Sequence, residues 1–341
     1  MILRHQPYTL ELRHAFGIAA GTRRSTPATL VEIEHEGITG HGEAAMPPYL
    51  GESQASAAAF CERARPLLAG VRDPFQREEI LPALDALAPG NTAAKAALDI
   101  ALHDWIGKKL GAPWFRLWGL DAAKTPVTSF TIGIDAPEVV REKTREAAIY
   151  KIIKVKLGRS PESDREMIEA IRSVTAAPIT VDANQGWKNR EEALRMIEWL
   201  AGRGVVFIEQ PMPKEQQADT AWLRSRSPLP LIADESCQRL GDMTRCVDAF
   251  HGINIKLMKC TGLREAHQMI VLARALGLKV MLGCMTETSC AISAAAQLSP
   301  LVDWADLDGA VLIKNDCFDG ATIVEGKITL PERSGIGALK K

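Results

Sequence analysis

Beyond residue 120 the chain repeats short apolar runs, and each run ends at or next to a polar residue. Successive end residues are 22 to 28 positions apart, a span that fits one strand, one helix and two short loops. Eight such units with no glycine-rich phosphate turn after the first strand favour a closed (β/α)8 type of barrel over an open doubly wound sheet. The eight side chains should then meet at one mouth of the barrel. They are Thr131, Lys156, Asp182, Glu209, Asp234, Lys256, Cys284 and Asp306.

The first 120 residues follow a different pattern. Residues 28–35 alternate apolar and polar side chains and precede three glycines within residues 37–42, which predicts a strand and a turn. Residues 91–109 carry apolar side chains at helical spacing until Gly111 and Pro113 end the pattern. We therefore predict an α+β domain over residues 1–120 and a catalytic barrel over residues 121–318.

Charge and composition exclude several classes of partner. The 41 basic and 42 acidic residues give a net charge of -1, which provides no electrostatic surface for nucleic acid or an anionic membrane. No run of eighteen apolar residues is present, and Arg4, Glu11 and Arg13 interrupt the N-terminal segment, so we expect no membrane span and no signal peptide. Seven scattered cysteines indicate reduced thiols. We expect a cytoplasmic protein with a small-molecule ligand.

Three carboxylates follow three successive predicted strands: Asp182 in ITVDANQGW, Glu209 in VVFIEQPMP and Asp234 in PLIADES. Each of them alone could cap the next helix. Together in one barrel mouth they would repel one another unless a cation lay between them. All-oxygen ligands without histidine or cysteine indicate Mg²⁺, with Mn²⁺ as a substitute, and argue against zinc.

Lysines flank the carboxylates on the predicted strands. Lys154 and Lys156 alternate within IIKVKLG, so both should point inward, and Lys256 follows in INIKLMK. Structural salt bridges to the carboxylates are one interpretation. The other is catalytic: Lys156 and Lys256, four strands apart, would face each other across a metal-bound substrate carboxylate. One lysine could then remove an α-proton while the other returns a proton to the opposite face, which is epimerisation or racemisation.

These motifs, with AALDIALHDWIGKKLG and DLDG, resemble the enolase superfamily, in its muconate lactonizing enzyme subgroup, and within it the dipeptide epimerases of the L-Ala-D/L-Glu type. The resemblance covers nearly the whole chain. It implies a modified TIM barrel, (β/α)7β, and an α+β N-terminal capping domain that is completed by about residues 319–341. It also implies that Mg²⁺ binds Asp182, Glu209 and Asp234, and that the reaction inverts the α-carbon of the C-terminal residue of a dipeptide.

The resemblance also implies the roles of the lysines. Lys156 would serve the (R)-configured substrate and Lys256 the (S)-configured substrate, while Lys154 would contact the substrate carboxylate. The metal and Lys154 would together stabilise the enediolate that forms after proton removal.

Further residues are candidates for substrate binding. Asp306 and Asp308 lie at a spacing of two, so both carboxylates could bind a free α-ammonium group, as in the DxD motif of the dipeptide epimerases, although an Asx turn is the alternative. Thr131 and Cys284 could line the site or simply pack there. Within residues 17–26, which we predict to be a mobile loop, Arg24 matches the family's arginine for a glutamate side chain, and Arg23 could take that role instead. Residues 46–50 could close the other side.

Other reactions stay open at this point. The same subgroup contains N-acylamino acid racemases, o-succinylbenzoate synthases and cycloisomerases, all with equivalent lysines. An acid sugar dehydratase is disfavoured because residues 280–288 contain no histidine. A non-catalytic binding barrel would have little need for two opposed bases around a metal. The sequence does not fix the preferred dipeptide, and it leaves open whether the chain forms a homo-oligomer.

Overall fold

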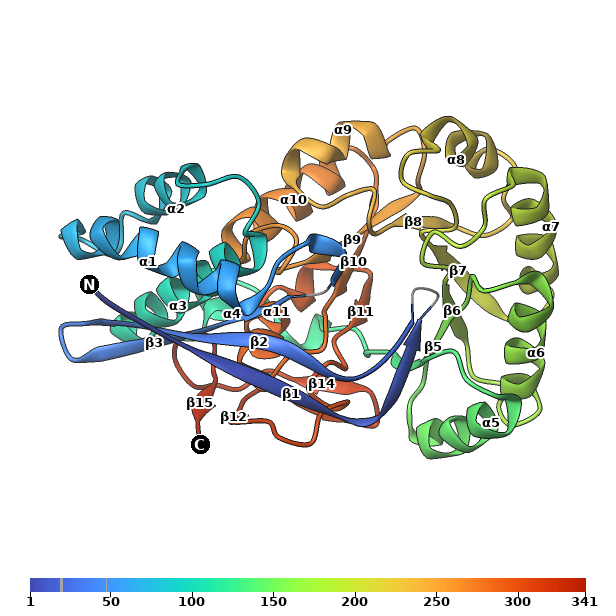
Figure 1. Cartoon of the computed structure of the whole chain (residues 1–341), viewed down its shortest axis with the longest axis horizontal. Coiled ribbons are helices and arrows are strands. Elements are labelled where there is room, and N and C mark those ends of the chain that lie inside the picture. The colour runs from blue at the N-terminus through green and yellow to red at the C-terminus, as the bar shows by residue number, and fades with distance from the viewer. Residues whose placement is uncertain (19–20, 47) are drawn as a thin grey trace.

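The computed structural model describes residues 1–18, 21–46 and 48–341. The N-terminal part is an antiparallel three-stranded sheet flanked by helices (Figure 1). Its elements are β1 (Ile2–Ile18), β2 (Gly21–His35), β3 (Ile38–Ala45), η1 (Pro48–Leu50), α1 (Gln54–Gly70), α2 (Arg77–Ala86), α3 (Thr92–Leu110), α4 (Trp114–Leu117) and η2 (Ala122–Lys124). The predicted α+β architecture is confirmed. The predicted turn over residues 37–42 is wrong, because the chain turns at Glu36 and Gly37, both with positive φ, and β3 begins at Ile38.

The second part is an eight-stranded parallel sheet in the order β4 to β11, with helices on its outside (Figure 1). The strands are β4 (Phe130–Ile132), β5 (Ile153–Lys156), β6 (Ile179–Asp182), β7 (Val205–Glu209), β8 (Leu231–Ala233), β9 (Gly252–Lys256), β10 (Lys279–Gly283) and β11 (Trp304–Asp306). Between them run α5 (Pro137–Glu146), η3 (Ala147–Ile149), α6 (Pro161–Arg172), α7 (Arg190–Ala201), α8 (Gln217–Arg224), η4 (Leu240–Asp242), α9 (Met243–Cys246), α10 (Leu263–Ala275), α11 (Ser289–Ala296) and η5 (Ser299–Leu301).

This sheet is nearly closed into a barrel. The first and last strands approach each other where Ser129 N donates to Ala305 O at 3.2 Å, just before β4. The strands are short and rich in Val and Ile, and most of their side chains are buried, as expected where helices cover the outside of a parallel sheet. The predicted (β/α)7β barrel with a capping domain is confirmed.

Apart from residues 19–20, the segment predicted as a mobile loop lies in the paired antiparallel strands β1 and β2. β1 continues to Ile18 and β2 starts at Gly21, while residues 19–20 lie outside the described chain. Close contact with the barrel fixes the hairpin, since Ile134 N donates to Gly17 O at 2.9 Å. A Cβ on Gly17 would lie 2.3 Å from Ile134 O, so only glycine permits this approach. The prediction of a loop is therefore wrong, because glycine content and polarity are as typical of a hairpin end as of an irregular loop.

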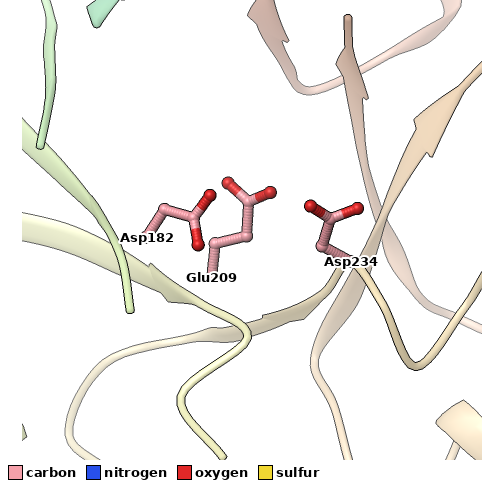
Figure 2. Close-up of side chains that lie close together, drawn as sticks. All are labelled: Asp182, Glu209 and Asp234. Atoms are coloured by element: carbon pink, nitrogen blue, oxygen red, sulfur yellow. The ribbon is translucent and has the colours of Figure 1, made fainter. Parts of the chain in front are cut away.

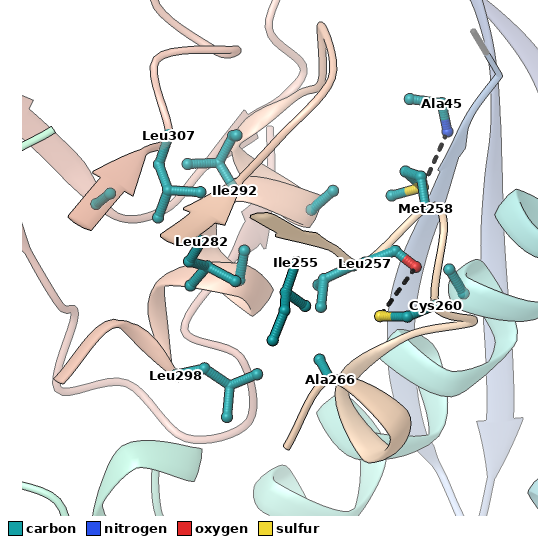
Figure 3. Packing of buried hydrophobic residues seen from close by; sticks show 14 of the residues in the cluster. Ala45, Ile255, Leu257, Met258, Cys260, Ala266, Leu282, Ile292, Leu298 and Leu307 are labelled. Carbon is teal, nitrogen blue, oxygen red and sulfur yellow. Dashed lines mark hydrogen bonds between the residues drawn. The ribbon is translucent and has the colours of Figure 1, made fainter. Parts of the chain in front are cut away.

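Two buried acidic side chains of the capping domain join it to barrel helices. Asp99 in α3 accepts hydrogen bonds from Leu263 N at the start of α10, and Glu43 in β3 accepts from Thr288 N next to α11. Apolar packing adds to these contacts, as Figure 3 shows around Met258, whose sulfur accepts from Ala45 N at the end of β3. The capping domain is therefore held at a fixed position beside the barrel.

The end of the chain returns to the capping domain. Residues beyond 317 form β12 (Phe318–Asp319), β13 (Thr322–Val324), β14 (Lys327–Thr329) and β15 (Leu339–Lys340), and Figure 1 places the C-terminus near the capping sheet. Ile336 N donates to Asp104 in α3, and Lys340 pairs with Glu32 in β2. These contacts agree with a capping domain completed by residues 319–341, and the boundaries at 120 and 318 stay predictions.

Candidate metal and catalytic site

Three carboxylates converge at the carboxyl ends of neighbouring strands. Asp182 ends β6, Glu209 ends β7 and Asp234 follows β8 directly. All three are at most 2% exposed, and one oxygen of each lies within 4.8 Å of the others. Figure 2 shows the three side chains pointing into the same space. Three buried oxygen donors at this spacing fit a hard divalent cation.

Two neighbours hold the carboxylates in place, and the sequence analysis did not single out either of them. Asn254 Nδ2 in β9 donates to Glu209 Oε1 at 2.6 Å. Lys259, which has no exposed surface, contacts Asp234 Oδ1 and donates to the backbone oxygens of Asp234, Cys237 and Asn254. A lysine in an otherwise apolar segment was the available signal for this role.

The electrostatics of the three carboxylates show a crowded acidic site. Burial and the neighbouring Asp182 raise the pKa of Glu209 to about 7. Burial also acts to raise the pKa of Asp182 and of Asp234, but nearby lysines outweigh it and lower both pKa values below their ordinary range. The site therefore keeps negative charge only where a cation is close, as a magnesium site would require.

The predicted lysines face these carboxylates. Lys156 ends β5 and its Nζ lies 2.6 Å from Asp182 Oδ2, while Lys256 ends β9 with its Nζ 2.8 Å from Asp234 Oδ2. Their strands are four apart in the eight-stranded barrel, so the lysines approach from opposite sides. Burial acts to lower the pKa of Lys256, but Asp234 and other acidic neighbours outweigh it and raise the pKa well above its ordinary range.

Lys154 joins the acidic trio to the predicted ammonium site. Its Nζ lies 2.7 Å from Glu209 Oε2 and 2.7 Å from Asp306 Oδ2. Asp306 also accepts from Ser129 Oγ, and Asp308 Oδ2 accepts from Thr131 N at 2.7 Å. Burial and Asp306 raise the pKa of Asp308 to about 7. Both aspartates thus lie at the mouth, but Asp306 has a lysine partner that the spacing alone could not predict.

A cavity of about 320 Å³ connects these groups, a volume within the range of small-molecule sites. Its lining contains the predicted Thr131, Lys154, Lys156, Asp234, Lys256, Cys284, Asp306 and Asp308, together with Gly21, Thr22, Arg23, Tyr49, Asn184, Met285, Thr286 and Leu312. The spacing predicted that Thr131 ends its strand, but Thr131 is the middle residue of β4. Cys284 follows β10 directly.

The two hairpin arginines lie on different faces of β2. Arg23 lines the cavity, and its Nη2 donates to Thr286 Oγ1 at 3.2 Å. Arg24 is exposed and is not among the described residues that line the cavity. Adjacent residues of a strand point to opposite faces, so only one of them can reach the mouth. Met285 and Thr286 were missed, because they approach through a loop whose position depends on the assembled fold. Tyr49 lies within residues 46–50, the segment named as able to close the other side, but was not singled out there.

Family models match both parts of the chain. "Mandelate racemase / muconate lactonizing enzyme, N-terminal domain" matches residues 4–119, and "Enolase C-terminal domain-like" matches residues 138–339. The chain belongs to the mandelate racemase and muconate lactonizing enzyme family. This result confirms the predicted superfamily and subgroup.

Relatives within this family are dipeptide epimerases. The chain is 62% identical over 335 residues to an L-Ala-D/L-Glu epimerase of Bacteroides thetaiotaomicron, covering 98% of this chain and 86% of that protein. It superimposes with a TM-score of 0.94 on a substrate complex of the Bacillus subtilis L-Ala-D/L-Glu epimerase, at 28% identity, covering 100% of this chain and 98% of that one. It also superimposes on a dipeptide epimerase of Enterococcus faecalis that is complexed with Mg and L-Leu-L-Tyr. The TM-score is 0.92 at 31% identity, and the match covers 99% of this chain and 98% of that one.

Proposed function

We propose that this family member is a magnesium-dependent dipeptide epimerase that inverts the α-carbon of the C-terminal residue of dipeptides such as L-Ala-L-Glu and L-Ala-D-Glu. One observation carries the proposal: Lys156 and Lys256 approach from opposite sides of a cavity that Asp234 lines, and Asp234 belongs to a buried trio of carboxylates with Asp182 and Glu209. The similarity to enzymes of this activity supports the substrate class.

The two lysines divide the proton transfer. Inversion requires one lysine to be neutral, so that it removes the α-proton, and the other to be an ammonium, so that it delivers a proton to the opposite face. Lys156 acts on the (R)-configured substrate and Lys256 on the (S)-configured one. Asp182, Glu209 and Asp234 would hold Mg²⁺, with Mn²⁺ as a substitute. When bound, the metal ion would offset the negative charge that raises the pKa of Lys256 and would stabilise negative charge on the substrate carboxylate.

The remaining cavity residues position the dipeptide. Asp306 and Asp308 bind its α-ammonium group, and Lys154, between Asp306 and the acidic trio, contacts its carboxylate as negative charge develops. Thr131 and Cys284 line the cavity between these groups. Together these contacts hold the α-carbon between the two lysines.

The side chain of the C-terminal residue is bound by Arg23 rather than Arg24. Arg23 points into the cavity from the hairpin, and its planar guanidinium can form two parallel hydrogen bonds with a carboxylate. Burial lowers the pKa of Arg23, with Tyr49 opposing the shift, which shows a guanidinium that is partly removed from water. We infer an acidic residue at the C-terminal position of the preferred dipeptide.

A second candidate function is racemisation of N-acylated amino acids. One structural neighbour, at TM-score 0.93 and 30% identity, is an N-succinyl Arg/Lys racemase of Bacillus cereus. Two buried aspartates at the mouth favour a free ammonium over an uncharged amide, because an amide would leave Asp308 without a cationic partner. A free amino group is therefore the feature that separates the two functions.

Proton NMR in deuterium oxide tests the proposal. With Mg²⁺, L-Ala-L-Glu should lose its glutamate α-proton signal while L-Ala-D-Glu appears, and N-acetyl-L-Glu should react far more slowly. Chelation should stop exchange, and Mg²⁺ should restore it. An enzyme that exchanges N-acetyl-L-Glu faster than every free dipeptide would instead be an N-acylamino acid racemase.

We further propose a cytoplasmic location, which the seven free cysteines support. None of the helices in the described chain is long and apolar enough to cross a membrane. A homo-oligomeric state stays a prediction.

A further inference from the structure

Two side chains of the capping domain reach neighbouring positions on the barrel. Tyr49, in η1, is 46% exposed, lines the catalytic cavity, and donates its hydroxyl hydrogen to Met285 Sδ at 3.6 Å. Arg23, on the hairpin, donates from Nη2 to Thr286 Oγ1 at 3.2 Å. Because Met285 and Thr286 are consecutive residues after β10, the phenol and the guanidinium lie side by side above the same segment.

The contact of the Tyr49 hydroxyl is weak for a donor of this kind. A thioether sulfur is a poor acceptor, and a phenol stays protonated at neutral pH, so the hydroxyl would form a stronger hydrogen bond with a carboxylate oxygen. Arg23 adds a planar set of donors beside it. A carboxylate between the two side chains would accept from both, while the dipeptide's α-carbon stays near Lys256, which lines the same cavity.

The charge of the lining supports this location for an acidic side chain. The other end of the cavity carries Asp306 and Asp308, which would repel a second carboxylate. Met285, Thr286 and the two capping side chains bring no acidic group. An acidic side chain of the dipeptide therefore fits better beneath the capping domain than beside Asp306 and Asp308.

We propose that Tyr49 is a specificity-determining residue whose hydroxyl, together with the Arg23 guanidinium, binds the side-chain carboxylate of an acidic C-terminal residue. This inference rests on the proposed dipeptide epimerase function. It makes substrate choice depend on two separate capping segments, the β1–β2 hairpin and η1, which meet where both contact the loop after β10.

The test compares kcat/KM for L-Ala-L-Glu with kcat/KM for the uncharged L-Ala-L-Met in wild type, Tyr49→Phe, Arg23→Met and the double variant. Tyr49→Phe should lower the Glu-to-Met selectivity ratio at least about tenfold, as expected for a hydrogen bond to a charged group. The double variant should lose less than the product of the two single effects, because both side chains bind one carboxylate. Tyr8→Phe is the matched control: it removes a hydroxyl that bonds to Asn315 O away from the cavity, and the ratio should hold.

An unchanged Glu-to-Met selectivity ratio in Tyr49→Phe would overturn the inference. This includes the case in which kcat/KM falls by the same factor for both substrates. Fully multiplicative effects in the double variant would show that the two side chains do not share a carboxylate, and would overturn it as well. Tyr49→Leu, which also lacks the hydroxyl, repeats the test if Tyr49→Phe does not fold. If the wild type exchanges the α-proton of no dipeptide in the presence of Mg²⁺, the proposed function itself is contradicted, which is a distinct result.

Discussion

Glu43 makes the stability of the interface between capping domain and barrel depend on pH. It has no exposed surface and accepts hydrogen bonds from Thr288 N at 2.9 Å and Ala291 N at 3.4 Å, at the start of α11. Burial raises its pKa from 4.5 to about 7, although the hydrogen bonds from Thr288 oppose the shift. The folded protein therefore holds a proton on this side chain at pH values where the unfolded chain has lost it.

The sign and size of the effect follow from this difference in pKa. Between pH 4.5 and 7 the folded state binds more protons than the unfolded state, so stability falls as the pH rises and the full loss is reached above pH 7. At 1.36 kcal/mol for each pKa unit, the part of the loss that occurs between pH 5.5 and 8.5 is about 2 kcal/mol. This loss should be absent when the side chain cannot ionise.

Glu43→Gln keeps the shape of the side chain and removes its charge. The free energy of unfolding of variant and wild type is measured by guanidinium denaturation at both pH values. The difference, variant minus wild type, should be about 2 kcal/mol larger at pH 8.5 than at pH 5.5. Glu36→Gln is the control, because Lys109 lowers the pKa of that exposed carboxylate and its removal should bring no gain with rising pH. A difference between Glu43→Gln and wild type that is the same at both pH values would refute the reasoning.

Three further outcomes are expected. Glu209→Gln should weaken Mg²⁺ binding, measured by calorimetry, at least about tenfold and leave the circular dichroism spectrum unchanged. Even the loss of a residue that only hydrogen-bonds to a metal ligand lowers metal affinity about 10- to 100-fold. An affinity equal to that of the wild type would contradict the metal site. Lys259→Met should lower the free energy of unfolding by about 3–5 kcal/mol, because it breaks a buried ion pair and leaves Lys256 as the one remaining lysine of the described chain in contact with Asp234, and a loss below about 1 kcal/mol would contradict this role. Arg23→Met should lower kcat/KM for L-Ala-L-Glu at least about tenfold while Arg24→Met leaves it nearly unchanged. The reverse result would show that Arg24, and not Arg23, binds the side-chain carboxylate.

The barrel and the positions of its lysines and carboxylates could be predicted from the sequence because they depend on local pattern. Strand ends repeat at regular intervals, and in a parallel barrel these ends share one face, so Asp182, Glu209 and Asp234 had to meet. The alternation of Lys154 and Lys156 fixed their inward direction in the same way, and both lysines line the cavity.

The substrate-binding part could be predicted only in outline, because it depends on how distant segments pack. Arg23 and Arg24 are adjacent, and only the register of the β1–β2 hairpin decides which of them faces the cavity. Tyr49 reaches the mouth through the position of the capping domain, which buried contacts such as that of Glu43 with Thr288 determine. Such contacts leave no periodic pattern in the sequence.

The two-base mechanism is tested most directly by single-turnover hydrogen exchange in lysine variants in deuterium oxide with Mg²⁺. In Lys256→Ala, deuterium should enter the α-carbon of L-Ala-D-Glu through Lys156, L-Ala-L-Glu should not exchange, and net epimerisation should be lost; Lys156→Ala should show the reverse. Exchange of both epimers in either variant, or epimerisation at the wild-type rate, would contradict a mechanism in which two opposed lysines each act on one face of the α-carbon.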